Sequence, residues 1–201
     1  MDSEIVKYVE QNILPQYEAF TDGHDRAHVE MVIRESLHLA QAHGANEDMA
    51  YVIAAYHDLG IPQGRKTHHL TSAALLAADE QLRKWFTPNQ LQIMKEAVED
   101  HRASAKAPPR TLYGSIAADA DHYIVPEDIV QRTMLYGRTN FPGLSNEEQI
   151  IRTREHIVEK FCDGGYLSFH LGDPRSIEGL NALRALAADE ARFADVCRKY
   201  L

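Results

Sequence analysis

Apolar residues recur every three or four positions along most of this chain, which is the periodicity of amphipathic α-helices. Between residues 26 and 43 the apolar positions expected to face a core are Val29, Val32, Ile33, Leu37 and Ala40. The sequence shows no convincing alternation of apolar and polar residues, which is the pattern of a half-buried strand. The pattern therefore predicts an all-α protein, in which helices are joined by short loops.

Capping and helix-breaking residues divide this pattern into segments. Thr87 with Gln90 and Ser145 with Glu148 have the form of capping boxes, each at the start of a predicted helix. The turn-forming cluster at residues 21–25 can cap the helix that follows it. The predicted helices cover residues 3–14, 26–43, 47–56, 67–86, 88–102, 112–124, 126–136, 146–161 and 175–200, and residues 137–144 are predicted as a loop. In the helix at 67–86, the residues expected to face inward are Leu75, Leu76 and Leu82.

Length and composition fit an ordinary folded domain. The 201 residues, 44% of them hydrophobic and 25% charged, are enough for one domain spanning residues 1–201 with a sizeable core. The net charge of −9 argues against a large non-specific nucleic-acid surface. The count of 11 histidines is unusually high, and most of them lie in the first two-thirds of the chain. This clustering directs attention to histidine chemistry.

Two further observations concern location. No apolar run is long enough to span a bilayer, and residues 1–10 lack the basic-then-apolar pattern of a signal sequence. Cys162 and Cys197 are too few for a disulfide framework. We therefore expect a cytoplasmic protein without a membrane partner.

His57 and Asp58 stand side by side at the end of the helix predicted at 47–56, just before the helix-stopping Gly60. A charge on a buried helix is costly unless it is paired or bound to a metal. An imidazole beside a carboxylate supplies the nitrogen and oxygen ligands that suit a divalent cation. The pair alone fits a satisfied polar contact at least as well.

Other histidines and aspartates occupy comparable positions. His28 lies in the first turn of its helix, where a capping role is the alternative. His101 continues the core-facing stripe of Met94, Ala97 and Val98. Asp121 follows Gly114, Ala117 and Ala118 at helical spacing, whereas Asp119 lies on another face. Taken singly, each residue is explained by a cap, a solvated face or a core hydrogen bond, so the argument depends on their occurring together.

The order His28, His57-Asp58, Asp121 resembles the HD superfamily of metal-dependent phosphohydrolases. The neighbouring words Gly23-His24-Asp25, Tyr56-His57-Asp58-Leu59-Gly60 and Ala118-Asp119-Ala120-Asp121 resemble it too. The resemblance covers about residues 20–140 and implies an HD-domain-like helical bundle, whose core we expect the helices of 145–201 to complete. It also implies that Asp121, and not Asp119, is the last metal ligand. His122 departs from the family pattern, in which a basic residue usually follows that aspartate.

The resemblance implies one or two divalent metal ions per chain. Members that hold two ions add two histidines between the His-Asp pair and the final aspartate, and His68 and His101 match those positions, with His69 as the alternative to His68. Mixed nitrogen and oxygen ligation suits Mn, Fe, Co, Ni or Mg. We interpret His24 and Asp25 as a hydrogen-bond partner of a ligand or as a helix cap.

The implied activity is hydrolysis of a nucleotide or another small phosphate ester. Asp58 would bind metal and orient or deprotonate the attacking water. Arg65 and Lys66, on the loop after the His-Asp pair, would neutralise phosphate charge, as would Arg102; solvated loop charge is the alternative for each. Two other functions stay open: a di-iron oxygenase that uses all six ligands, and a ligand-binding module without catalysis. The sequence leaves the oligomeric state undecided.

Overall fold

The computed structural model describes residues 1–20, 24–105 and 107–201, so Thr21, Asp22 and Gly23 of the predicted capping turn lie outside the described residues. The described chain is helical throughout and contains no strand, which confirms the all-α prediction. Its α-helices are α1 (Ser3–Asn12), α2 (Arg26–Ala42), α3 (Glu47–Tyr56), α4 (His68–Ala78), α5 (Pro88–Asp100), α6 (Leu112–Asp121), α7 (Pro126–Asn140), α8 (Asn146–Phe161), α9 (Pro174–Ala188) and α10 (Glu190–Arg198). Three short 3-10 helices accompany them: η1 (Leu14–Ala19), η2 (Ile61–Gln63) and η3 (Glu80–Lys84).

The helices form two compact units. Unit 1 comprises Met1–His122 together with the short segment Phe169–Leu171, and unit 2 comprises Tyr123–Ser168 and Gly172–Leu201. No helix in the described ranges is long and apolar enough to cross a membrane. The idea that the C-terminal helices complete the core of residues 20–140 stays a prediction.

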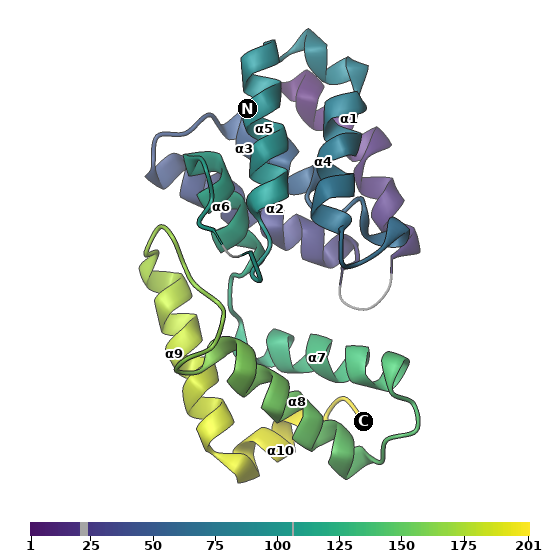
Figure 1. Ribbon diagram of the computed structural model, residues 1–201, viewed down its shortest axis with the longest axis vertical. Coiled ribbons are helices and arrows are strands. Elements are labelled where there is room, and N and C mark those ends of the chain that lie inside the picture. Colours follow the sequence, from purple (N-terminus) through teal and green to yellow (C-terminus); the bar gives the residue numbers. More distant parts are fainter. Residues whose placement is uncertain (21–23, 106) are drawn as a thin grey trace. The chain divides into compact units, whose positions relative to one another are not determined.

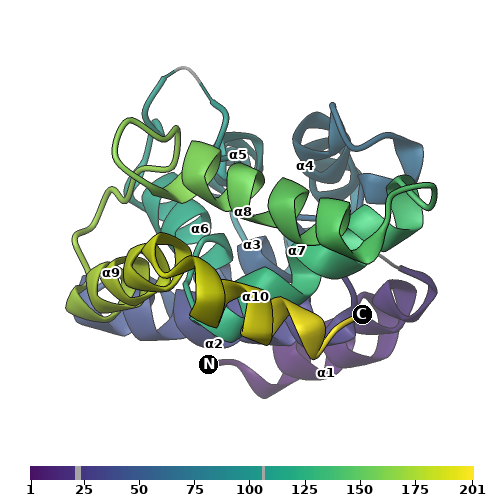
Figure 2. The ribbon, with the colours of Figure 1, turned by 90° about the horizontal axis from the view of Figure 1, so that it is seen from below.

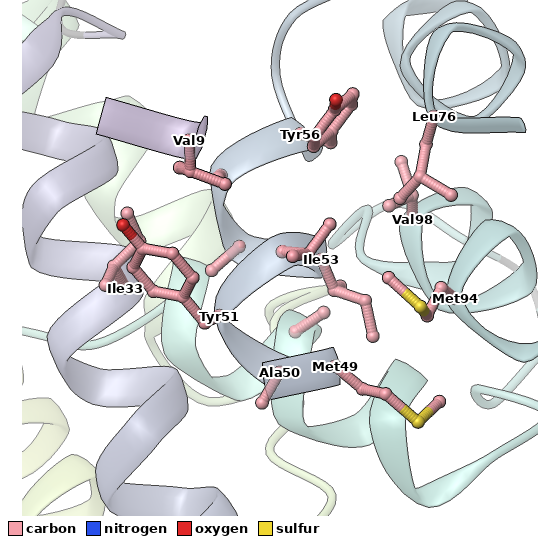
Figure 3. Packing of buried hydrophobic residues seen from close by; sticks show 14 of the residues in the cluster. Val9, Ile33, Met49, Ala50, Tyr51, Ile53, Tyr56, Leu76, Met94 and Val98 are labelled. Atoms are coloured by element: carbon pink, nitrogen blue, oxygen red, sulfur yellow. The ribbon is translucent and has the colours of Figure 1, made fainter. Parts of the chain in front are cut away.

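Unit 1 is built around α3, whose residues are all buried from Met49 to Tyr56. α2 packs against α3 and α6, and α5 packs against α3, α4 and α6 (Figure 1). Figure 3 shows the side chain of Ile53 directed toward Met94 and Val98 of α5, whereas Tyr51 lies on the side of Ile33. Because α3 is apolar on every face, it forms the centre of unit 1 rather than its surface.

Unit 2 contains α7, α8, α9 and α10, each of which contacts the other three (Figure 2). Its helices are amphipathic, and their apolar stripes meet in a core. That core includes Val130, Met134, Ile157, Leu183 and Phe193, which are all inaccessible to solvent.

Two predicted helices are each divided into two elements, and an aspartate explains both divisions. The predicted helix at 67–86 ends at Ala78, where Asp79 takes an extended backbone and its side chain accepts a hydrogen bond from the amide of Gln81. The predicted helix at 175–200 is divided in the same way by Asp189, which caps α10 through the amide of Arg192. Aspartate occurs both as an N-cap and inside helices. The periodicity of the apolar residues alone therefore does not reveal where an aspartate ends one helix and starts another.

Two other predictions were wrong. The first four residues of the loop predicted at 137–144 belong to α7, and α8 crosses so close to Gly137 that a Cβ atom there would meet the side chain of Gln149. The amide of Gln149 also donates to the carbonyl groups of Gly137 and Phe141, which satisfies the end of α7. Leu75 is 36% exposed instead of facing the core, although Leu76 and Leu82 are buried as predicted.

Candidate metal centre

The His-Asp pair lies in the turn that ends α3. His57 is the C-cap of this helix, and both His57 and Asp58 are buried. Tyr17 in η1 stabilises the last turn of α3, because its buried hydroxyl donates to the carbonyl oxygen of Ala55 at 3.0 Å. The apolar packing of α3 thus brings two ionisable groups into the interior of unit 1, where they need polar partners.

Helices α2 and α6 contribute one side chain each. His28 lies in the first turn of α2, whose N-cap Asp25 accepts from the His28 amide at 3.1 Å. Asp121 is the last residue of α6. His28 Nε2 lies 3.1 Å from Asp121 Oδ1, and His57 Nε2 lies 3.8 Å from the same oxygen. One carboxylate oxygen therefore faces two imidazole nitrogens.

Helices α4 and α5 contribute a second pair of imidazoles. His68 begins α4 and His101 caps the end of α5, and their Nε2 atoms are 3.1 Å apart. Gly60 allows α4 to approach the His-Asp turn, because a Cβ atom on this residue would lie 2.6 Å from the His68 carbonyl oxygen. The Gly60 amide also donates to the hydroxyl of Ser72 at 2.8 Å. The glycine that follows the His-Asp pair is thus a requirement of the contact that brings His68 to the cluster.

The cluster has two sides: His28, His57 and Asp121 form one, and His68 and His101 form the other. Asp58 lies between them, with one oxygen directed to each. Its Oδ2 atom is 3.1 Å from His57 Nε2 and 3.7 Å from His28 Nε2. Its Oδ1 atom is 3.3 Å from His68 Nε2 and 3.7 Å from His101 Nε2. The carboxylate is therefore placed to be shared by two neighbouring cation sites.

Three of the imidazoles are oriented in the same way. The Nδ1–H groups of His57, His68 and His101 donate to the main-chain carbonyl groups of Ala54, Arg65 and Val98, respectively, at 2.7, 2.7 and 2.6 Å. Each acceptor lies three residues before its histidine. Such a bond fixes the tautomer and leaves Nε2 with a lone pair, which is how metal-ligating histidines are usually held.

These side chains match what a divalent cation requires. His28, His57 and Asp121 offer ligand atoms that lie within 4.8 Å of one another, and so do Asp58, His68 and His101. His57 Nε2 is buried and has no hydrogen-bond partner within the described ranges of the chain. Beside two carboxylates this nitrogen needs a positive charge, which either a proton or a metal cation supplies. The donor set of imidazole and carboxylate suits Mn, Fe, Co or Ni.

The comparisons with known proteins agree with this geometry. The family model of the HD domain matches residues 26–125, the segment from the start of α2 to just past α6 that carries all six side chains. The chain belongs to the HD domain superfamily.

The fold of this HD protein has also been seen in a crystal. A protein from Lactobacillus plantarum of known crystal structure resembles it with a TM-score of 0.64 and 16% sequence identity, over 93% of this chain and 95% of that one. At this identity the likeness concerns the fold alone. No curated protein matches the HD protein in sequence.

The charges of the cluster hold both carboxylates ionised. Burial would raise the pKa of Asp58, but His57, His101 and His24 lower it well below its usual range. Burial would likewise raise the pKa of Asp121, and the adjacent His122 and His28 lower it.

The two sides of the cluster differ in their imidazoles. Burial would lower the pKa of His57, but Asp58 and Asp121 raise it to about 9. Burial lowers the pKa of His68 to about 4 despite the nearby Asp58, and its neighbour His101 adds to the effect. Without metal, the two sides therefore differ in proton content at neutral pH.

Other residues considered from the sequence lie elsewhere. The carboxylate of Asp119 accepts from the amides of His170 and Leu171 and so anchors the segment Phe169–Leu171 within unit 1. His69 is half-buried with its ring 5.7 Å from that of His68, and it belongs to neither group of ligands. His122 Nε2 lies 3.3 Å from Asp121 Oδ2, so an imidazole adjoins the carboxylate where the family usually has a basic residue.

The predicted phosphate contacts are on the surface. Arg65 and Lys66 have exposed side chains, and their main-chain carbonyl groups serve the site instead. The carbonyl of Arg65 holds His68, and that of Lys66 accepts from Arg102 at 2.7 Å. The ligand roles of the six residues and the phosphate role of these cations stay predictions.

One residue gained a role that the sequence analysis did not assign. Tyr17 supports the end of α3, and no feature of its sequence neighbourhood indicates this. Of the two residues considered as partner or cap, Asp25 is the cap of α2, and His24 binds the Asp58 carboxylate.

Proposed function

We propose that this HD protein is a metal-dependent phosphohydrolase that hydrolyses a nucleotide or another small phosphate ester. The observation that carries the proposal is the position of Asp58, whose two oxygens face the two sides of one buried cluster. A pair of divalent ions bound there would polarise a phosphoryl oxygen and bring the pKa of a water molecule toward neutrality.

The chain's own residues have distinct parts in this proposal. His28, His57 and Asp121 would hold one ion, and His68 and His101 the other, with Asp58 shared between them. Asp58, kept ionised by its imidazole neighbours, would also orient the attacking water through its carboxylate. The main-chain bonds to three of the imidazoles keep the ligands in place before metal or substrate arrives.

The phosphate would be met by cations next to the cluster. Arg65 and Lys66 precede His68 on the loop, and Arg102 follows His101, so each lies within three residues of an imidazole of the second pair. Their charge would favour a small anionic substrate at this side of the cluster. A phosphorylated small molecule is the partner that the proposal requires.

A di-iron oxygenase is the second candidate, and the convergence of His68 and His101 on Asp58 supports it. Six ligands of this kind also suit two irons. The metal content after aerobic purification separates the two candidates, because an oxygenase would retain iron whereas a hydrolase would be active with redox-inert ions as well.

The test is a screen of the purified protein against nucleotides and phosphomonoesters, with Mn²⁺, Fe²⁺, Co²⁺, Ni²⁺ and Mg²⁺ added separately. We expect release of phosphate or pyrophosphate that depends on metal and is lost in His57→Ala. Binding of phosphorylated compounds without turnover, under every metal, would refute the proposal in favour of a non-catalytic binding module.

A further inference from the structure

His24 contributes a hydrogen bond to the centre from outside the two imidazole pairs. It directly precedes Asp25, the N-cap of α2, and its Nδ1 atom lies 2.7 Å from Asp58 Oδ2. Because an ionised carboxylate only accepts hydrogen bonds, Nδ1–H of His24 is the donor. The His24 side chain is 20% exposed, compared with 3% for that of Asp58, so this donor reaches the buried carboxylate from the solvent side.

The bond engages one oxygen of Asp58 only. That oxygen, Oδ2, is the one that faces His57 and His28, and the His24 ring stands edge-on to the His28 ring at 5.3 Å between centroids. The other oxygen is left to the pair formed by His68 and His101. His24 therefore lies where its hydrogen bond can fix the orientation of the Asp58 carboxylate.

The orientation of this carboxylate matters because it must serve two sides. The terminal torsion of an aspartate has a broad energy profile, so the side chain by itself does not fix the plane of its two oxygens. A cation bound to His28, His57 and Asp121 would attract both oxygens into a bidentate contact. The group of Asp58, His68 and His101 contains a single carboxylate, so such a rotation would leave its second cation with two imidazoles.

We propose that His24 is a positioning residue that holds Asp58 in the bridging orientation and thereby makes the second metal site. The inference rests on the two-ion centre of the proposed function. The donor Nδ1–H occupies one lone pair of Oδ2, which opposes rotation of the carboxylate and keeps Oδ1 directed at His68 and His101. His24 thus governs the number of ions bound, while the first ion keeps its own ligands.

Direct metal ligation by His24 is the competing role, because its ligand atom lies within 4.8 Å of those of His28 and Asp58. Substitution by asparagine separates the two roles. The side-chain amide nitrogen of asparagine stands at the position of Nδ1 in histidine, where it donates a hydrogen bond and has no lone pair for a cation. The carbonyl oxygen of asparagine then stands at the position of Cδ2, where histidine has no ligand atom. A positioning role survives His24→Asn, whereas a ligating imidazole is lost in it.

The experiment is a titration of metal-free protein with Mn²⁺, followed by elemental analysis of the bound metal. We compare wild type, His24→Ala, His24→Asn and the control His38→Ala, which removes an exposed histidine from the adjoining helix α2. At Mn²⁺ concentrations that load wild type and the control with two ions per chain, His24→Ala should hold one. His24→Asn should hold two, with the affinity of the second ion within about tenfold of wild type, since loss of such a partner costs roughly 10–100-fold.

Three outcomes overturn the inference. Two ions in His24→Ala would show that the bond is dispensable, and one ion in both variants would assign a ligating role to the imidazole. If wild type itself holds a single ion, both the two-ion centre and the proposed role of His24 are refuted. If wild type holds two ions, responds to His24→Ala as expected and hydrolyses no phosphate ester, only the proposed reaction fails.

Discussion

Both units bury polar side chains, but they use them differently. In unit 2, Gln149 donates to the carbonyl groups at the end of α7, and Asp173 accepts from the amide of Arg175 at the start of α9. Each of these side chains serves the main chain of a neighbouring element. In unit 1, Asp58 faces imidazoles from three distant places in the sequence, at His28, His68 and His101.

The difference shows what distinguishes a site from a structural contact. A buried polar group needs a partner, and a main-chain amide or carbonyl at a helix end provides one at little cost. A cluster of imidazoles and carboxylates that face one another instead needs positive charge among them, from protons or from cations, as at His57 Nε2 beside Asp58. Convergence of side chains, rather than their burial, therefore identifies the metal centre in unit 1.

The largest effect is expected from Asp58→Ala, because both sides of the cluster lose their common ligand. Metal affinity and any hydrolytic activity should fall by more than about 100-fold, the upper effect of removing a mere supporting partner. The matched variant in unit 2 is Gln149→Ala, which removes two hydrogen bonds to carbonyl groups at the end of α7 and should lower the free energy of unfolding by about 1–3 kcal/mol. It should retain all its metal. Elemental analysis and chemical denaturation measure the two effects, and full metal occupancy in Asp58→Ala would contradict the assignment.

The two aspartates of α6 provide the same contrast inside unit 1. Asp121→Ala should lose metal, since its carboxylate faces His28 and His57. Asp119→Ala should keep metal and lower the free energy of unfolding by about 1–3 kcal/mol, because the amides of His170 and Leu171 lose their acceptor. Thermal unfolding of the metal-free variants, together with metal analysis, checks both. Greater metal loss in Asp119→Ala would reverse the assignment.

The pH dependence of metal binding should reflect the two sides of the cluster. Burial would lower the pKa of His57, but its carboxylate neighbours raise it to about 9, so the metal-free protein carries a proton there at neutral pH. A cation must displace this proton, and affinity should therefore fall about tenfold for each pH unit below about 9. His68, with its pKa lowered to about 4, should release none. Calorimetry in buffers of different ionisation enthalpy measures the protons released; a constant affinity between about pH 6 and 9 would count against this picture.

The smallest effect is expected at the surface. Arg65→Ala and Lys66→Ala should raise the KM for a phosphate substrate by a few-fold and leave metal content unchanged, because both side chains are exposed and salt screens their charge. Their main-chain bonds to His68 and Arg102 do not depend on the side chain. If neither variant changes KM on a confirmed substrate, the loop carries only solvated charge.

The sequence predicted much of unit 1 because its signals are local. Helical spacing indicated which way His101 and Asp121 would point, and the resemblance to HD proteins supplied the order of the ligands. The structure brings His28, His57, Asp58, His68, His101 and Asp121 together.

The remaining features depend on contacts that no local pattern records. Asp79 and Asp189 divide predicted helices because each caps the following element, and the end of α7 accepts hydrogen bonds from Gln149 of α8. The sequence analysis left His24 as either a ligand's partner or a cap, and only the contact with Asp58, 34 residues away along the chain, shows which of the two it is.

The central claim is that Asp58 is shared by two cation sites, and the number of bound ions tests it most directly. Metal-free wild type and the double variant His68→Ala/His101→Ala should be loaded with Mn²⁺ to saturation, freed of unbound ions and analysed for metal per chain. We expect two ions in wild type and one in the double variant, which keeps His28, His57, Asp58 and Asp121. A wild type that never exceeds one ion, or a double variant that still holds two, would contradict the claim.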